Sequence, residues 1–492
     1  MGIIRNVFER VKGLFGKTAF RNSQLGATFI TDDMATAIDR WADLYANKAP
    51  WLAKNRQSIG LPASIAREIA TLVTLEMQVS ITDPKGTDKD NSRAAFIESV
   101  FDGILEQIQV QTEYACALGG LVFKPYVSNG QIALDYVQAD DFYPVSFNSK
   151  GEIKSALFIE HKRTDREWFT RIERHEITND DYVVTNKAYR GYSDNDIGTE
   201  VSLTMVEEWA DIEPETHIQN CSIPLFAYFK IPQGNIVDKH SLLGVSVFAR
   251  ADTAGLLEEA DKQWQRFMWE YEGGEMAIDA STDAFKHIKT IGGELIPVLP
   301  AGKERLFRMN GIIGSSTASD ASNLMKTFAP TLRDSNYGSG LNNILMRVED
   351  ACGLARGTFS DVNEAARTAT ELKTSKQRSY ATVTSIQHSL ENALNMLAKA
   401  LDALATLYNL APAGEYNISY VWDDSIVVDA DTEREKDRAD VRDGLMLPWE
   451  YRVKWYGETE EKAKQILAEN QSQSDDDIMG FAKMLSEPTI EE

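Results

Sequence analysis

Residues 349–380 read EDACGLARGTFSDVNEAARTATELKTSKQRSY. Glycines, hydroxyls and arginines crowd into the first half, and a helical pattern then begins and continues for dozens of residues. Glycine-rich loops that open a helix often bind phosphate, because the backbone N–H groups at a helix N-terminus attract anions. The stretch is therefore either a nucleotide-binding loop or a loop that faces something larger.

The nucleotide interpretation fails on spacing. The segment GLARGT at 353–358 has two glycines, but a P-loop has the pattern GxxxxGK[ST] and its lysine is missing here. The residues before it also have a helical pattern, whereas a P-loop follows a strand.

The helix after the loop is unusually long. Its apolar residues are spaced by three or four positions: Val383, Ile386, Leu390, Leu394, Leu397, Leu401, Leu404 and Tyr408. A helix over 368–410 would span about 60 Å, longer than a typical globular domain. This length suggests a subunit of a large assembly.

Composition limits the class of protein. The chain has 492 residues, 43% hydrophobic and 26% charged, which predicts a folded protein of several structural units. Cys116, Cys221 and Cys352 form no metal-binding spacing and are expected to be reduced thiols of an intracellular protein. The net charge of -24 argues against gripping DNA through a broad basic surface, but it allows a protein that surrounds DNA without holding it.

The acidic charge is concentrated at the C-terminal end. Residues 423–492 contain 20 acidic and 9 basic residues, nearly half of the net excess. The last segment, 471–492, is rich in Ser, Asp and Glu and is predicted to be a disordered acidic tail.

The order of elements predicts an α+β protein. Helices are expected from 31, from 61 and from Ser92 to the stop at Gly119-Gly120, and hairpin strands follow to about 209. Helix is expected again over 242–273, with Leu257, Trp264, Met268 and Tyr271 on one side. We interpret the aromatic run WQRFMWEYE within it as packing residues, in preference to a nucleobase platform.

The second half continues with a small insertion of short apolar runs and turns at 274–327, followed by helix to Cys352. After the long helix, 417–429 predicts a strand pair or a bent strand. Charged helices are expected before Gly444, over 447–457 and from about 458.

Two other classes of function must be weighed. The carboxylate pairs Asp140-Asp141, Asp180-Asp181 and Asp423-Asp424 are of the kind that metal-dependent nucleases or phosphoryl enzymes use, although Asp is also common at turns. The six histidines form no metal motif, and no catalytic set emerges, so no enzyme and no cofactor is predicted. Residues 1–20 are basic and amphipathic, which fits either a membrane-peripheral scaffold or docking on a protein partner.

Three stretches resemble one protein family. They are ACALGGLVFKPYVSNGQIALDYVQADDFYPVSFNSKGEI at 115–153, the opening stretch at 349–380, and WDDSIVVDADTEREKDRADVRDGLMLPWEYRVKWYGETEEKAKQIL at 422–467. The motifs in these stretches, and their order along the chain, are similar to those of portal proteins of tailed double-stranded DNA bacteriophages, especially long-tailed phages of Gram-positive hosts. The tail beyond residue 471 is not part of this resemblance.

The resemblance implies a domain order. Residues 1–241 would form the wing, 242–273 the first stem helix, 274–327 a small α/β clip and 328–352 the second stem helix. Residues 353–367 would be the tunnel loop, 368–412 the long wing-crossing helix and 413–470 a helical crown.

The resemblance also implies a function and partners. The chain would form a ring, usually a dodecamer, at one capsid vertex of the virion after assembly in the host cytoplasm. Double-stranded DNA would pass through it without sequence specificity. The terminase large subunit, a head-completion adaptor, and major capsid and scaffolding proteins would bind it, with no membrane involved.

Candidate DNA-facing residues lie in and after the tunnel loop. The set is Arg356, Thr358, Ser360, Asn363, Arg367 and Lys373. Basic residues near an acidic bore would contact phosphates briefly while like charge keeps DNA from sticking. Salt bridges between subunits are an equally good explanation for the basic members of this set.

Overall fold

The computed structural model describes most of the chain. It covers residues 30–52, 57–84, 92–149, 151–164, 167–178, 181–192, 198–281, 286–290, 292–298, 306–310, 325–361, 369–422, 430–457, 459–460 and 462–467. The chain divides into two compact units, Met1–Val421 and Trp422–Glu492, which we describe separately. The predicted α+β class is confirmed.

Four helices open the described part of the first unit: α2 (Asp32–Tyr45), α3 (Leu61–Thr74), α4 (Arg93–Leu105) and α5 (Ile108–Leu118). Thr31 and Ser92 cap α2 and α4, each accepting a hydrogen bond from a backbone N–H three residues on. The single helix predicted from Ser92 to Gly119 is wrong. It divides at Glu106-Gln107 because α4 packs against β1 and α9, whereas α5 packs against α2 and α3.

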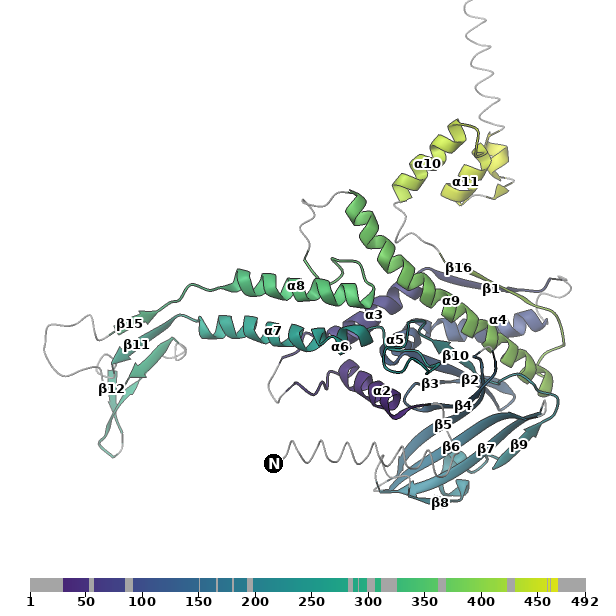
Figure 1. Ribbon diagram of the computed structural model, residues 1–492, viewed down its shortest axis with the longest axis horizontal. Helices are drawn as coiled ribbons and strands as arrows, with labels where there is room; N and C mark the ends of the chain where they lie inside the picture. Colours follow the sequence, from purple (N-terminus) through teal and green to yellow (C-terminus); the bar gives the residue numbers. More distant parts are fainter. Residues whose placement is uncertain are drawn as a thin grey trace, which may run out of the picture. The chain divides into compact units, whose positions relative to one another are not determined.

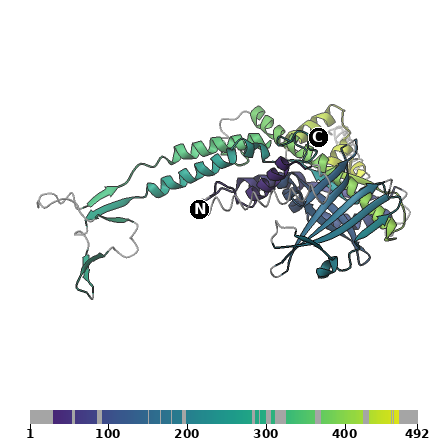
Figure 2. The ribbon, with the colours of Figure 1, turned by 60° about the horizontal axis from the view of Figure 1, so that its bottom comes forward.

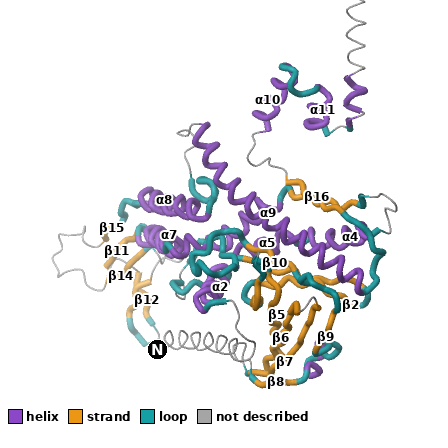
Figure 3. The backbone as a smooth tube through the Cα atoms, turned by 45° about the vertical axis from the view of Figure 1, so that its right-hand side comes forward, coloured by secondary structure: helices purple, strands orange, loops and turns teal. Residues whose placement is uncertain are grey.

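Two antiparallel sheets follow the helices (Figures 1 and 3). The smaller has the order β10 (Ala227–Lys230), β2 (Gly120–Ser128), β3 (Gln131–Gln138). The larger contains β4 (Phe142–Phe147), β5 (Ile153–Thr164), β6 (Glu167–Thr178), β7 (Asp181–Gly191), β8 (Thr199–Val201) and β9 (Glu215–Ile218). The predicted hairpin at 120–138 is confirmed. Its turn, Asn129-Gly130, has positive φ at both residues, as a two-residue hairpin requires.

The strand predicted over 200–209 is mostly wrong. After β8 the chain forms two short 3₁₀ helices, η1 (Leu203–Met205) and η2 (Glu207–Trp209). These turns bury Leu203 and Trp209 in a cluster with Phe169 and Ala188 of the larger sheet. Tertiary packing of one tryptophan therefore overrides the strand-like pattern.

Two long helices, α7 (Leu256–Gly273) and α8 (Asp334–Cys352), lie side by side (Figure 2). Helix does not begin at 242 as predicted: α6 (Ala249–Thr253) starts it, and Gly255, with φ of 71°, separates α6 from α7. At the other end, Arg333 donates from Nε and Nη2 to the carboxylate of Glu270, at 3.0 and 2.7 Å. This ion pair joins the two helices where the insertion begins.

The one-sided stripe predicted for α7 is fully buried only at its beginning. Leu257 is buried, whereas Trp264 and Met268 are partly buried and Tyr271 is 40% exposed. The packing interpretation of the aromatic run holds only in part. The rings of Phe267 and Tyr271 pack together with their centroids 5.0 Å apart, whereas Trp269 is 63% exposed. A buried carboxylate occupies the helix instead, since Asp261 accepts from Trp51 Nε1 and Ser58 Oγ, both at 2.9 Å.

The insertion between α7 and α8 consists of strands where it is described. β11 (Ala277–Ser281) lies between β14 (Phe307–Asn310), which is parallel to it, and β15 (Met325–Phe328), which is antiparallel. β12 (Lys286–Lys289) and β13 (Leu295–Val298) form a hairpin. The described part contains no helix of the expected α/β clip.

The long helix is confirmed as α9 (Ala369–Leu407), 39 residues. Its predicted stripe is the centre of the core, with Ile386, Leu390, Leu394, Leu397 and Leu401 fully buried. α9 packs on β10, β2, α3 and α4, so it ties the N-terminal helices to the smaller sheet. Burial of each of these side chains contributes about 1.5–3 kcal/mol.

After α9 the chain forms β16 (Asn417–Trp422), which pairs with β1 (Met77–Thr82) from the far end of the sequence. Of the strand pair or bent strand expected over 417–429, the structure describes β16, which has a distant partner, and residues 423–429 lie outside the described part.

The second unit is described through α10 (Ala430–Arg442), α11 (Pro448–Tyr456) and a helical segment at 462–467. α10 and α11 pack against each other. The predicted helix ends are confirmed, since Gly444 and Gly457 have positive φ and Pro448 occupies the first turn of α11. The predicted tail at 471–492 lies outside the described residues.

Candidate functional site

The candidate site is the connection between α8 and α9, of which residues 353–361 are described (Figure 1). α8 ends because Gly353 adopts φ of 74°, a left-handed conformation that favours glycine. A Cβ at this position would also lie 2.4 Å from Thr382 Oγ1 on α9. The loop therefore begins where α8 and α9 come close together.

A buried carboxylate organises the first part of the loop. Glu349, in the last turn of α8, is 0% exposed. Its Oε1 accepts from the backbone N–H groups of Phe359 and Ser360, at 2.6 and 2.7 Å. Its Oε2 accepts from Ser360 Oγ at 2.7 Å and from Gly357 N at 3.3 Å. The chain thus folds back around Glu349, which supplies acceptors to four donors of the loop.

Helix α9 holds the same part of the loop from the other side. Ser379 Oγ accepts from Ala355 N at 2.6 Å, and Thr382 Oγ1 donates to Gly353 O at 3.0 Å. At the far end, Asn342 on α8 exchanges two hydrogen bonds with the backbone of Asp361, at 2.7 and 2.8 Å. α9 therefore holds the start of the segment 353–361, and α8 holds its remainder.

A second carboxylate, Asp350, pairs with the arginines of this region. Arg356 donates to it from Nε and Nη2, at 3.2 and 2.7 Å, and Arg378 of α9 also donates to it. The hydrogen bonds from Arg356, followed by the charges of both guanidinium groups, lower the pKa of the Asp350 carboxyl despite its partial burial. Asp350 is thus a carboxylate shared by two cations.

The structure describes three of the six predicted site residues in full. The Arg356 side chain is 45% exposed but paired with Asp350, and Thr358 Oγ1 donates to Ala355 O at 2.7 Å. Ser360 is only 6% exposed and its hydroxyl is bonded to Glu349. Asn363 and Arg367 lie outside the described residues; Lys373 lies in α9, but its side chain is not described.

Sequence reasoning missed Glu349, Asp350, Asn342 and Ser379. A signal for the first two was present, because two adjacent acids in the last turn of a helix oppose the helix dipole and therefore require partners. Ser379 and Asn342 carried no comparable signal, since their roles depend on how α8 and α9 pack.

The alternative of a metal-dependent enzyme requires a cluster of metal-binding side chains. No group of three or more His, Cys, Asp or Glu side chains that could hold a metal ion occurs among the described residues. The backbone carbonyl of Asp140 accepts from the Tyr143 hydroxyl at 2.6 Å, as expected at a turn. Asp180 and Asp423-Asp424 lie outside the described part, as does the N-terminal segment 1–29.

Across the described helices, none has both the length and the apolar character needed to cross a membrane. The cysteines are described and all three are free and buried. Burial raises the pKa of the Cys352 thiol to about 12, so it stays protonated near neutral pH.

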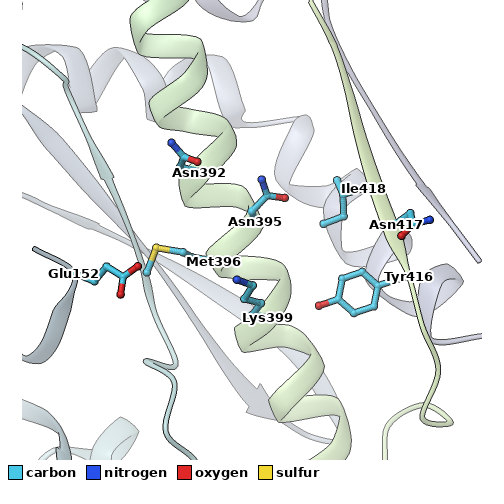
Figure 4. A pocket seen from close by; sticks show the side chains of 8 residues that line it. All are labelled: Glu152, Asn392, Asn395, Met396, Lys399, Tyr416, Asn417 and Ile418. Atoms are coloured by element: carbon cyan, nitrogen blue, oxygen red, sulfur yellow. The ribbon is translucent and has the colours of Figure 1, made fainter. Parts of the chain in front are cut away.

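One pocket of about 710 Å³ opens beside α9 (Figure 4). It is lined by Glu152, Asn392, Asn395, Met396, Lys399, Tyr416, Asn417 and Ile418. Asn395 is already engaged, since its Oδ1 accepts from the Tyr420 hydroxyl at 3.2 Å. The lining holds no histidine, cysteine or serine, and we assign it no chemistry.

Comparison with known proteins identifies the family. The chain matches the family model described as phage portal protein, SPP1 Gp6-like, over residues 31–476. The chain therefore belongs to this family of phage portal proteins, and the predicted resemblance is confirmed. No curated protein sequence matches it.

Two solved structures are similar at a low level. One is a chain in the neck of a native GTA particle computed with C12 symmetry, with 12% identity and a TM-score of 0.35, covering 80% of this chain and 89% of that one. The other is in the neck of an empty GTA particle computed with C6 symmetry, with 11% identity and a TM-score of 0.37, covering 85% and 92%. At these TM-scores we base no argument on either likeness.

Proposed function

We propose that the chain forms a closed ring, a dodecamer, at one vertex of the capsid. Double-stranded DNA enters the head through this ring during packaging and leaves through it on ejection. The observation that supports this most is the portal family match over residues 31–476. The 39-residue helix α9 and the acidic net charge of -24 are consistent with a conduit that does not hold DNA tightly.

In this proposal the parts have separate roles. The insertion at 274–327 binds the terminase large subunit during packaging and the head-completion adaptor afterwards. Major capsid and scaffolding proteins surround the ring in the virion. Hydrolytic energy comes from the partner motor, and the chain itself acts as a structural component.

Loop 353–367 faces the DNA in this proposal, with an amended set of contacts. We leave Ser360 out, because its hydroxyl is buried and bonded to Glu349. Arg356 is a weaker candidate than sequence suggested, since a DNA phosphate would have to compete with Asp350 for its guanidinium. The other proposed DNA-facing residues are unchanged: Thr358, Asn363, Arg367 and Lys373.

Particle shape tests the ring. Negative-stain images of the purified full chain are expected to show rings with a central hole. A compact monomer at micromolar concentration would count against the proposal. DNA cleavage that depends on a divalent metal and is lost in Asp140→Ala would point to the nuclease alternative instead.

Loop length tests the channel lining. Shortening the segment 362–367 leaves residues 353–361 and their contacts with Glu349 in place. Rings are expected to form as in the parent, while the amount of packaged DNA per head falls. A variant with Val362→Ala alone serves as the control for a change in the same segment without shortening. Unchanged packaging in the shortened variant would remove the role of this loop.

A further inference from the structure

Two arginines of α10 converge on one tyrosine of α11. Arg434 Nε and Arg438 Nε both donate to the hydroxyl oxygen of Tyr451, at 3.2 and 3.0 Å. The two arginines are four residues apart, so they lie one turn apart on the same face of α10. Two positive guanidinium groups are thus held next to each other by a group that carries no full negative charge.

Neither guanidinium has a carboxylate partner among the residues that the structure describes. Two acids of these helices are engaged elsewhere. Asp437 accepts from Lys454 Nζ at 2.7 Å and Trp455 Nε1 at 2.8 Å, and Glu450 accepts from Leu447 N at 2.8 Å. Among the described residues, the arginine pair therefore donates to a neutral oxygen and to no carboxylate.

Aromatic rings hold Arg434 in place. Its guanidinium carbon lies 5.9 Å from the ring centroid of Trp455 and 5.5 Å from that of Tyr456. Such stacking orients the planar group and leaves its edge available for hydrogen bonds. Arg438 is exposed, and its only described hydrogen bond uses Nε, so its two Nη groups are open to a ligand.

The direction of the pKa shift of Tyr451 agrees with the positive charge of the two arginines. Partial burial acts to raise the pKa of its hydroxyl, but the hydrogen bonds from Arg434 and Arg438 and their charges lower it overall. A field that favours the phenolate also favours any other oxyanion placed beside it.

We propose that Arg434 and Arg438, positioned by Tyr451, form a binding site for a phosphodiester group of the DNA backbone. Guanidinium edges match phosphate oxygens in geometry and bind them through charge-assisted hydrogen bonds. Contacts to phosphate are independent of base sequence. The site is small and local, so it is compatible with a chain that is acidic as a whole, and it does not depend on the ring proposal.

Binding of a fluorescently labelled DNA duplex to the full-length protein tests the site. The variant Arg434→Gln/Arg438→Gln is expected to bind roughly tenfold more weakly at low salt. Because it loses contact with one or two phosphates, the slope of log Kobs against log[salt] falls by about 1–2. Arg442→Gln is the control that matches the single variant Arg438→Gln in charge, since each removes one positive charge from α10, and among the described residues Arg442 pairs only with Asp443. Equal weakening in the double variant and the control would overturn the proposal.

Two further measurements keep the proposal testable if the double variant unfolds. Arg438→Gln alone leaves the stacked Arg434 in place, and it is expected to weaken DNA binding without a change in thermal unfolding. In the unmodified protein, the duplex is expected to protect Arg434 and Arg438 from phenylglyoxal, measured by peptide mass spectrometry. Protection by inorganic phosphate but not by the duplex would overturn the assignment to DNA, as would protection by neither.

Discussion

The chain uses its arginines in two contrasting ways. In the α8–α9 loop, Arg356 and Arg378 both pair with one carboxylate, Asp350. In the α10–α11 unit, Arg434 and Arg438 share only a phenolic oxygen. The charge of the first pair is offset by a carboxylate, whereas the second pair donates to a neutral oxygen. A count of basic residues in the sequence would treat the two regions alike.

The largest effect is expected from Glu349→Ala. It leaves the N–H groups of Phe359 and Ser360 without their acceptor, whereas Gly357 N keeps its bond to Ser360 Oγ. Each unsatisfied buried donor costs about 1–3 kcal/mol. We expect local stability to fall by roughly 2–6 kcal/mol for the two donors, measured by hydrogen exchange of these amides.

Ser360→Ala is the control for that change, because it removes the hydroxyl's bonds to Glu349 and Gly357 N but keeps the backbone donors of Phe359 and Ser360 on Glu349. It is expected to cost about 1 kcal/mol. Exchange rates in Glu349→Ala equal to those of the parent would show that the carboxylate does not hold the loop.

A second comparison uses two glycines with nearly equal backbone angles. Gly353 and Gly444 have φ of 74° and 77°, but only Gly353 has close neighbours, with Thr382 Oγ1 2.4 Å from a Cβ added there. The Cβ of Gly444→Ala would meet no neighbouring atom. The substitution should therefore lower the free energy of unfolding only by the cost of a left-handed backbone conformation for alanine, about 1–2 kcal/mol. Gly353→Ala should lower thermal stability clearly more. Equal losses in denaturation experiments would mean that α9 can move away from the loop.

The shared carboxylate predicts a pH dependence. Asp350 has a lowered folded-state pKa, so its ion pairs stabilise the protein above the unfolded value of about 3.9 and are lost as pH falls through the folded value. Asp350→Asn should therefore be less stable than the parent by about 0.5–1 kcal/mol near neutral pH, given the exposure of its partners. The difference should shrink below pH of about 4. A difference that stays constant down to strongly acidic pH would contradict the ion-pair explanation.

The smallest effect on stability is expected from Arg438→Gln. Arg438 is exposed and makes one neutral hydrogen bond, so its loss should change unfolding by less than about 0.5 kcal/mol. A loss as large as that of Asp350→Asn would show that Arg438 is a structural residue like Arg356.

Sequence predicted the elements whose pattern is local. The stripe from Val383 to Leu404 predicted α9, and the turn Asn129-Gly130 predicted the β2–β3 hairpin. Local pattern did not predict the break before α5 or the turns around Trp209, because both depend on distant packing partners.

The sequence predicted the position of the loop between the two helices, but it did not predict the side-chain contacts that hold the loop. Gly353 and the residue types of 353–358 indicated a loop between helices. That Ser360 turns inward to Glu349, and that Arg356 turns back to Asp350, depends on side-chain partners supplied by the folded helices. Residue type alone therefore did not predict that these two side chains bond within the protein.

A reconstruction of the ring assembled from the full chain tests the central claim most directly. The account predicts that loop 353–367 lines the central opening while Glu349 keeps its contacts with residues 357–360. A ring in which this loop lies away from the opening, or a protein that forms no ring at all, would contradict it.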